Sequence, residues 1–232
     1  MDLKQQAAEY ALNFVQDGML LGLGSGSTAT CFLNLLGERL KSGTLRGIRG
    51  VPTSSSSAER AKAASIPLIT LVETAGPAGL PSLDLAVDGA DEIDPHLGLI
   101  KGLGRAMLRE KVIEIHARRF IVIAEETKLV PRLGRGPLPV EILPFEAEVI
   151  VRWLRTISSR AELWLNADGS PVVTDNGNYL ARCWFTEGIS DPSALARTLA
   201  DRPGVLEHGL FLSMASLAVI ASPGGIQIME RE

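Results

Sequence analysis

Short apolar runs alternate with amphipathic segments over the first 130 residues of the chain. Apolar residues between Leu3 and Val15 recur at the spacing of one helical face, which predicts a helix. Met19 to Leu23 is wholly apolar, as expected for a strand that is buried on both faces. The same patterns predict further helices at 28–40, 58–64 and 106–116, and further strands at 48–51, 68–71, 83–87 and 120–124. Strands that alternate with helices indicate βαβ units and a parallel sheet.

The pattern changes after Lys128, where four prolines interrupt the chain up to Phe145. Asn176-Gly177 predicts a type I′ hairpin, and Asp191-Pro192 predicts the capped start of a helix. A helix is also expected at 145–157, with strands at 162–166, 171–174 and 179–185 and a strand at 217–221 that returns to the parallel sheet. The expected fold is therefore α/β, with a Rossmann-like parallel-sheet domain formed by 1–130 plus 206–232 and a smaller inserted α+β domain at 131–205.

The composition is that of an ordinary α/β protein, with 232 residues of which 46% are hydrophobic and 22% charged. The net charge of −4 argues against nucleic acid as a partner. Cys31 and Cys183 stand far apart, so neither a disulfide framework nor a zinc site is expected. Residues 1–15 lack the apolar core of a signal peptide, and no apolar run reaches the roughly 18 residues of a membrane helix. We therefore expect a cytoplasmic protein with no membrane partner.

A glycine-rich segment, Gly22 to Thr28, joins the first strand to the next helix. Glycines let a ligand approach the backbone, and a helix N-terminus offers N–H groups and partial positive charge that suit a phosphate. Ser25, Gly26, Ser27 and Thr28 are therefore candidate ligand-binding residues. A tight turn with a capping hydroxyl would explain the same residues.

The segment 24–29 also fits the dinucleotide pattern G-x-G-x-x-[GA]. That pattern needs an acid about 20 residues further on to hold the ribose hydroxyls. Residues 50–55 contain hydroxyl side chains and no acid, so a phosphate suits them better. The 2′-phosphate of NADP could use the same hydroxyls, which leaves an NADP-binding oxidoreductase open.

Four acids, Asp88, Asp91, Glu92 and Asp94, directly follow the apolar strand at 83–87. Ligands of parallel sheets bind at the carboxyl ends of the strands. The acids suit three interpretations, which are contacts and proton transfer with sugar hydroxyls, a Mg²⁺ site, or a solvated acidic turn.

A second glycine loop, Lys101-Gly102-Leu103-Gly104-Arg105, precedes the helix that contains Glu110. Leu108, Val112 and Ile115 form the apolar stripe of this helix, and Glu110 lies off the stripe. Periodicity alone therefore predicts that Glu110 is a surface acid.

In this order, the motifs resemble those of the type A ribose-5-phosphate isomerase family. The matching blocks are GLGSGST at 22–28, VDGADEID at 87–94, KGLGRAMLREK at 101–111, LPVEI at 138–142, TDNGN at 174–178 and PGVLEHGLF at 203–211. The resemblance implies the same Rossmann-like fold and a cofactor-free, metal-free interconversion of ribose 5-phosphate and ribulose 5-phosphate, in the non-oxidative branch of the pentose phosphate pathway. It also implies a homodimer or a larger homo-oligomer.

The resemblance assigns roles to individual residues. Glu110 matches the catalytic base, while Asp88, Asp91 and Lys101 match residues that hold and polarise the open-chain sugar. Further substrate contacts are implied for Ser25, Gly26, Ser27, Thr28, Gly89, Ala90, Gly102, Leu103, Gly104 and Lys128.

Leu103 and Arg105 depart from the K-G-G-G run that is usual in the family. We expect Leu103 to pack against the protein and Arg105 to face solvent or a neighbouring subunit, so that the loop amides keep their role. The rival interpretation from another class is a non-catalytic domain that senses a sugar phosphate. Such a regulator needs a DNA-binding module, and no helix-turn-helix pattern precedes the first strand.

Overall fold

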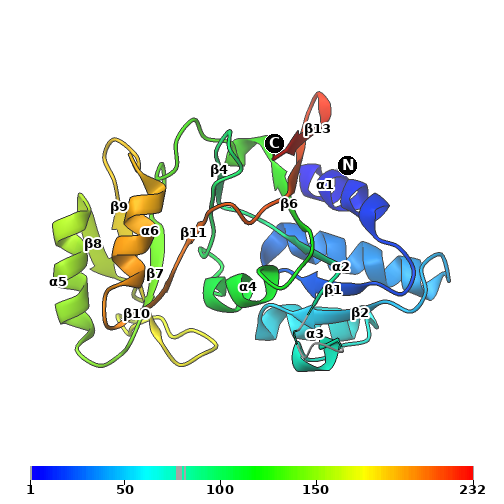
Figure 1. Ribbon diagram of the computed structural model, residues 1–232, viewed down its shortest axis with the longest axis horizontal. Helices are drawn as coiled ribbons and strands as arrows, with labels where there is room; N and C mark the ends of the chain where they lie inside the picture. Colours follow the sequence, from blue (N-terminus) through cyan, green and yellow to red (C-terminus); the bar gives the residue numbers. More distant parts are fainter. Residues whose placement is uncertain (1, 77–79, 81, 232) are drawn as a thin grey trace. The chain divides into compact units, whose positions relative to one another are not determined.

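The computed structural model describes residues 2–76, 80 and 82–231. The chain forms two compact units. The colours in Figure 1 follow the sequence from the N-terminus to the C-terminus. Unit 1 comprises residues 1–90, 109–128 and 213–232, and unit 2 comprises residues 91–108 and 129–212. Within the described residues, no helix combines the length and apolar character that crossing a membrane requires.

Unit 1 is built on a six-stranded sheet with the strand order β13-β12-β6-β3-β1-β2. The strands are β1 (Leu20–Leu23), β2 (Arg49–Pro52), β3 (Leu85–Asp88), β6 (Phe120–Glu125), β12 (Leu217–Ser222) and β13 (Gly225–Glu230). All neighbouring pairs are parallel except β12 and β13. The predicted parallel sheet is therefore confirmed, as is the return of 217–221 to it beside β6.

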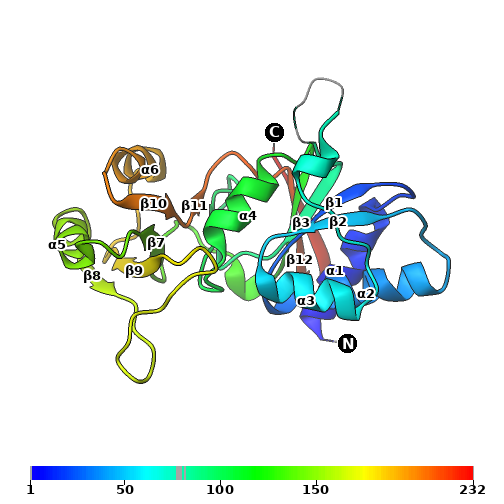
Figure 2. The same ribbon diagram turned by 90° about the horizontal axis from the view of Figure 1, so that it is seen from below.

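The helices of unit 1 cover both faces of this sheet (Figure 2). They are α1 (Leu3–Ala11), α2 (Gly26–Lys41), α3 (Ser55–Ala63) and α4 (Met107–Glu114), of which the first two residues belong to unit 2. Short 3-10 turns are η1 (Leu12–Phe14), η2 (Val72–Thr74) and η3 (Glu126–Lys128). Leu21 and Leu23 of β1 point into the core formed with α1 and α2. Gly22 points the other way, toward Ile113 of α4. Alternation along β1 thus places α4 on the opposite face from α1 and α2.

Unit 2 contains a four-stranded antiparallel sheet in the order β10-β7-β9-β8. Its strands are β7 (Leu138–Ile142), β8 (Arg160–Leu163), β9 (Tyr179–Trp184) and β10 (Val205–His208), and its helices are α5 (Ala147–Ile157) and α6 (Pro192–Ala200). Both helices pack on one face, where Leu138, Val140 and Ile142 form the core (Figure 1). The Asp191 carboxylate accepts a hydrogen bond from the N–H of Ala194, so the predicted helix cap is confirmed.

The opposite face of β7 carries a buried carboxylate, Glu141. Its Oε1 accepts hydrogen bonds from Thr174 Oγ1 at 2.9 Å, Asn176 Nδ2 at 3.1 Å and Asn178 Nδ2 at 2.8 Å. The turn that carries these donors has only Gly177 in the left-handed region, with φ 79°. A type I′ turn needs positive φ at Asn176 as well, so that prediction is wrong. The side chains of the turn bind Glu141, and Gly177 is the residue whose left-handed conformation completes the turn.

Unit 2 also contains a three-stranded sheet, β11-β5-β4, formed by β4 (Glu92–Ile93), β5 (Leu99–Ile100) and β11 (Leu210–Phe211). This sheet draws residues 91–108 into unit 2, whereas the sequence placed them with the larger domain. Hydrogen bonds from Gly134 and Gly136 N–H groups to the Glu92 carboxylate add a second connection. The sequence pattern gave no sign of β4 and β5, because two-residue strands carry no periodicity.

Two predicted strands are reduced to isolated bridges. Of the segment 68–71, only Leu68 pairs, in a bridge with Gly50. Pro171 and Val173 make single bridges with Leu165 and Tyr179. Both segments are short apolar runs, which a loop that packs on the core can also contain.

Both cysteines are free thiols, in agreement with the sequence. Burial raises the pKa of the Cys183 thiol to about 12, so this residue is a small apolar core group at neutral pH.

Candidate active site

The first glycine loop begins where the backbone of Gly24 meets Asp88 at the end of β3. The Gly24 N–H donates to the carbonyl of Val87 at 3.0 Å. A Cβ on Gly24 would lie 2.3 Å from Asp88 Oδ1 and 2.5 Å from the Val87 carbonyl oxygen. Only glycine permits this approach, because a side chain would push the two loops apart.

The carboxylate of Asp88 is 1% exposed and is oriented by backbone donors. Its Oδ1 accepts hydrogen bonds from the N–H of Ser25 at 2.9 Å and from that of Gly89 at 2.7 Å. The acid that sequence analysis selected is therefore a fixed, buried group and not part of a solvated turn. Gly89 and Ala90, which follow it, are half-buried.

The hydroxyl of Ser25 links two loops of unit 1. Ser25 Oγ lies 2.8 Å from Thr53 Oγ1 and 2.7 Å from Ser54 Oγ. Ser54 in turn caps α3 in a reciprocal pair of hydrogen bonds with Ser57. The hydroxyl cluster that the sequence suggested for a phosphate is thus largely engaged in holding the ends of β1 and β2 together.

The helix α2 begins at Gly26, which has a left-handed φ of 88°. Ser27 is exposed and Thr28 is half-buried. The N–H groups of a first helical turn have no partner within the helix and carry its positive partial charge. This end of α2 is therefore suited to an anion.

The other three acids of the 87–94 segment each bind backbone N–H groups of their own. Asp91 Oδ2 accepts from the N–H of Leu103 at 2.9 Å. Glu92 binds the loop at 134–136, as described above. Asp94 Oδ1 accepts from the N–H groups of His96 at 2.9 Å and Gly98 at 2.8 Å. Each of these carboxylates therefore has its own set of backbone donors, and among the described residues no three His, Cys, Asp or Glu side chains are grouped as they would be around a metal ion.

Lys101 is 3% exposed, and its ammonium lies 5.4 Å from the centre of the Phe211 ring. The backbone N–H of Lys101 donates to the carbonyl of Gly209 at 2.9 Å. The π face of a ring attracts a cation. The Phe211 ring is therefore a favourable neighbour for the buried ammonium of Lys101.

Glu110 lies on the buried face of α4 and is 4% exposed. Met107, Ile113 and Glu114 share this face, one turn before and after it. Val112 and Ile115 are 45% and 61% exposed, so the predicted apolar stripe is wrong and the periodicity pointed to the solvent side of the helix.

Sequence analysis did not select Glu114, which is also buried. Its spacing of four residues from Glu110, which places both acids on one helical face, is the only signal that could have found it.

The second glycine loop is anchored at one end and exposed in the middle. A Cβ on Gly102 would lie 2.8 Å from Met107 Sδ and 3.2 Å from Pro139 Cγ, so the loop packs tightly there. Leu103 is 39% exposed, and the expectation that it packs against the protein is wrong. Arg105 is exposed, as expected, but its guanidinium also lies 5.2 Å from the centre of the Trp164 ring.

Lys128 ends the 3-10 turn after β6 and is half-exposed. It therefore follows the strand next to β3, the strand that ends at Asp88.

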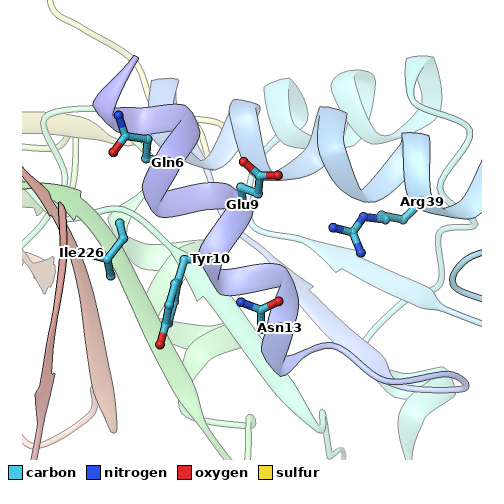
Figure 3. A pocket seen from close by; sticks show the side chains of 6 residues that line it. All are labelled: Gln6, Glu9, Tyr10, Asn13, Arg39 and Ile226. Carbon is cyan, nitrogen blue, oxygen red and sulfur yellow. The ribbon is translucent and has the colours of Figure 1, made fainter. Parts of the chain in front are cut away.

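A separate hollow of about 370 Å³ lies on unit 1 (Figure 3). Side chains of α1 and η1, together with Arg39 of α2 and Ile226 of β13, surround it. Its lining residues are Gln6, Glu9, Tyr10, Asn13, Arg39 and Ile226. None of the candidate site residues is among them, so this hollow is not the site.

Comparison with known proteins decides the family. The family model described as ribose 5-phosphate isomerase A (phosphoriboisomerase A) matches residues 49–225, well over half of the chain. The chain belongs to the ribose-5-phosphate isomerase A family. It is 51% identical over 228 residues to ribose-5-phosphate isomerase A of Roseiflexus castenholzii, covering 98% of this chain and 94% of that one. It is 43% identical to the probable chloroplastic ribose-5-phosphate isomerase 3 of Arabidopsis thaliana, covering 99% and 83%.

Solved structures of the family share the fold of this chain. Ribose 5-phosphate isomerase of Plasmodium falciparum superposes with a TM-score of 0.93 at 34% identity and covers 99% of this chain and 98% of its own. A D-ribose-5-phosphate isomerase in complex with phospho-erythronic acid superposes with a TM-score of 0.92 at 40% identity and covers all of both chains. The α/β fold class with a Rossmann-like parallel sheet is therefore confirmed.

Replacement of Gly24 by alanine is expected to lower the free energy of unfolding by about 1–3 kcal/mol, because the new methyl group collides with Asp88 and Val87. Urea denaturation measures the change. Gly224→Ala is the matched control, since its Cβ would meet only Ser222 Oγ at 3.6 Å, and no loss is expected there. If both variants were equally stable, the close approach at Gly24 would not constrain the loops.

Proposed function

We propose that this chain interconverts D-ribose 5-phosphate and D-ribulose 5-phosphate through a cis-enediolate, with Glu110 as the base. Such an aldose–ketose isomerase acts in the non-oxidative branch of the pentose phosphate pathway and uses no cofactor. The observation that carries the proposal is the burial of Glu110 on the inward face of α4, in a chain that belongs to the ribose-5-phosphate isomerase A family.

The reaction moves a proton between two neighbouring carbons of the open-chain sugar. Glu110 removes the proton from C2, which leaves the enediolate, and then returns a proton to C1. A positioned base of this kind contributes roughly 10²–10⁴ to the rate. Burial suits the role, because it keeps the carried proton from exchanging freely with water.

Negative charge develops on O1 as the enediolate forms. The ammonium of Lys101 stabilises that charge, together with the N–H groups of Gly102 and Gly104, while the N–H of Leu103 binds Asp91. A fixed cation in a site with little water stabilises such a charge more than a solvated one does. The burial of Lys101 and its contact with Phe211 support this role.

Asp88 and Asp91 bind the sugar hydroxyls, and one of the two relays the proton between O1 and O2. Each carboxylate already accepts backbone hydrogen bonds that orient it, Asp88 from Ser25 and Gly89 and Asp91 from Leu103. Gly89 and Ala90 form the backbone between them and contact the same sugar.

The phosphate group provides binding energy that orients the reacting carbons. We assign it to Ser25, Gly26, Ser27 and Thr28 at the start of α2, with Lys128 as a further contact. The partial positive charge of the helix N-terminus supports this assignment, and Ser25 contributes its backbone, since its hydroxyl lies within hydrogen-bonding distance of Thr53 and Ser54.

We also propose that the chain works in the cytoplasm as a homodimer or a larger homo-oligomer, with no nucleic-acid partner. Size-exclusion chromatography with light scattering tests the assembly. A sugar-phosphate sensor or an NADP-binding oxidoreductase would bind its ligand without forming ribulose 5-phosphate, so an NMR assay of that product separates these alternatives.

Glu110→Gln keeps the size of the side chain but cannot take up a proton at neutral pH. We expect kcat to fall by at least about 10², with KM changed much less. Steady-state kinetics of ribulose 5-phosphate formation measure both constants.

Glu114→Gln is the matched control for this substitution, because Glu114 is equally buried on the same helical face. Its kcat is expected to stay within about threefold of the parent value. A Glu110→Gln enzyme with near-normal kcat would show that Glu110 is not the base. Equal losses of kcat in both variants would show that the effect is not specific to Glu110.

Full activity is expected after exhaustive treatment with EDTA. The acids that suggested a Mg²⁺ site bind backbone N–H groups, and Lys101 supplies the positive charge at O1. Initial rates before and after dialysis against EDTA test this, with dialysis in plain buffer as the control. Lost activity that Mg²⁺ restores would instead indicate a metal-polarised carbonyl.

Lys101→Ala is expected to lower kcat/KM by more than about 10², because it removes the charge aimed at the enediolate. Leu103→Gly and Arg105→Ala are each expected to change kcat/KM by less than about tenfold, or roughly 1.4 kcal/mol, because the loop contributes backbone groups. If Arg105→Ala proved as damaging as Lys101→Ala, Arg105 would reach the substrate and the preferred sugar phosphate would have to be reconsidered.

A further inference from the structure

Arg105 closes the Lys101–Arg105 loop in a backbone conformation that is unfavourable for its residue type. Its φ is 68°, in the left-handed region, and its N–H donates to the carbonyl of Gly102 at 2.9 Å. A residue with a β carbon adopts this region at an energetic cost, and such residues persist where their surroundings hold them. A contact of the Arg105 side chain can offset this cost.

The contact is a cation–π stack between Arg105 and Trp164, in which the guanidinium carbon lies 5.2 Å from the ring centre. Both residues belong to unit 2, but they lie far apart in the sequence. Trp164 directly follows β8, and its N–H donates to the carbonyl of Leu180 at 2.7 Å. The ring that receives Arg105 is thus carried by the four-stranded sheet.

Trp164 is itself fixed by a ladder of stacked side chains on the same sheet. The Arg182 guanidinium lies 5.0 Å from the Trp164 ring centre and 5.3 Å from that of Trp184, and Arg160 lies 4.6 Å from Trp184. The Glu162 carboxylate binds both Arg182 and Arg160. Partial burial alone would raise the pKa of Glu162, but hydrogen bonds and positive charge from the two arginines lower it, so the carboxylate stays ionised and the ladder stays paired.

From these contacts we infer that the Arg105–Trp164 stack is a latch that holds the substrate loop, which makes Arg105 and Trp164 positioning residues of the isomerase. Gly102 fixes one end of the loop by packing on Met107 and Pro139, and the stack fixes the other end. Between the two lie the Leu103 N–H that binds Asp91 and the exposed Gly104. The inference rests on the proposed role of this loop in binding the sugar.

A double-mutant cycle between the two partners tests the latch. Arg105→Gly removes the stack without adding backbone strain, because glycine adopts the left-handed turn freely, while Trp164→Leu removes the ring. Each single variant is expected to lower kcat/KM by about two- to fivefold, mainly through KM, because a displaced loop weakens binding throughout the reaction. The kcat/KM of the double variant is expected to be no lower than that of the less active single variant, because each single substitution already removes the whole stack. Trp164→Phe keeps an aromatic face and is expected to recover to within about twofold of the parent.

Arg202→Ala is the matched control, because Arg202 also stacks on a tryptophan of unit 2, Trp153, with its guanidinium 5.0 Å from the ring centre, but belongs to neither the ladder nor the loop. Its KM and kcat are expected to equal those of the parent, and thermal melting compares the stability of all variants. Losses in kcat/KM that multiply in the double variant, or an equal rise in KM for Arg202→Ala, would overturn the latch. All effects are ratios to the parent enzyme, so the cycle can fail while ribulose 5-phosphate formation by the parent still supports the proposed function.

Discussion

The arrangement of the candidate site in unit 1 depends on the contact between the backbone of Gly24 and the carboxylate of Asp88. Strands β1 and β3 are parallel neighbours, with Leu23 opposite Val87, so the residues that follow this pair meet at one edge of the sheet. The missing side chain at Gly24 lets Asp88 accept the N–H of Ser25. The hydrogen bond orients both the start of α2 and the carboxylate of Asp88. It thereby links the anion-binding end of the helix to the first of the proposed catalytic acids.

Sequence patterns predicted most of the fold because the central strands are buried on both faces. A continuous apolar run such as Leu20–Leu23 has few alternatives in an α/β chain, and Asp191-Pro192 carries its own local capping chemistry. The failures lie where long-range contacts decide. The two-residue strands β4 and β5 exist only through pairing with each other and with β11, and the Asn176-Gly177 turn is shaped by its bonds to Glu141.

The site was harder to predict from pattern alone, because its acids are buried by partners that lie far away in the sequence. Helical periodicity places Glu110 on the polar side of α4. In the structure Glu110 is buried, while Val112 and Ile115 face solvent. Glu92 and Glu141 are also buried, and each accepts hydrogen bonds from donors that lie more than 30 residues away. Family resemblance supplied the assignment of Glu110, and nothing in the residue pattern could have replaced it. A buried carboxylate needs nearby donors, and a one-dimensional pattern does not show where those donors come from.

The discontinuity of unit 1 has a consequence for synthesis on the ribosome. Strand β12 pairs with β6, but residues 129–212, most of unit 2, must be translated between the two. Until β12 emerges, β6 remains an open edge with unpaired backbone groups, which is a place where nascent chains can associate wrongly. Translation of these residues sets the shortest time for which the edge is open, and rapid folding of unit 2 would keep that time from growing longer once β12 has emerged.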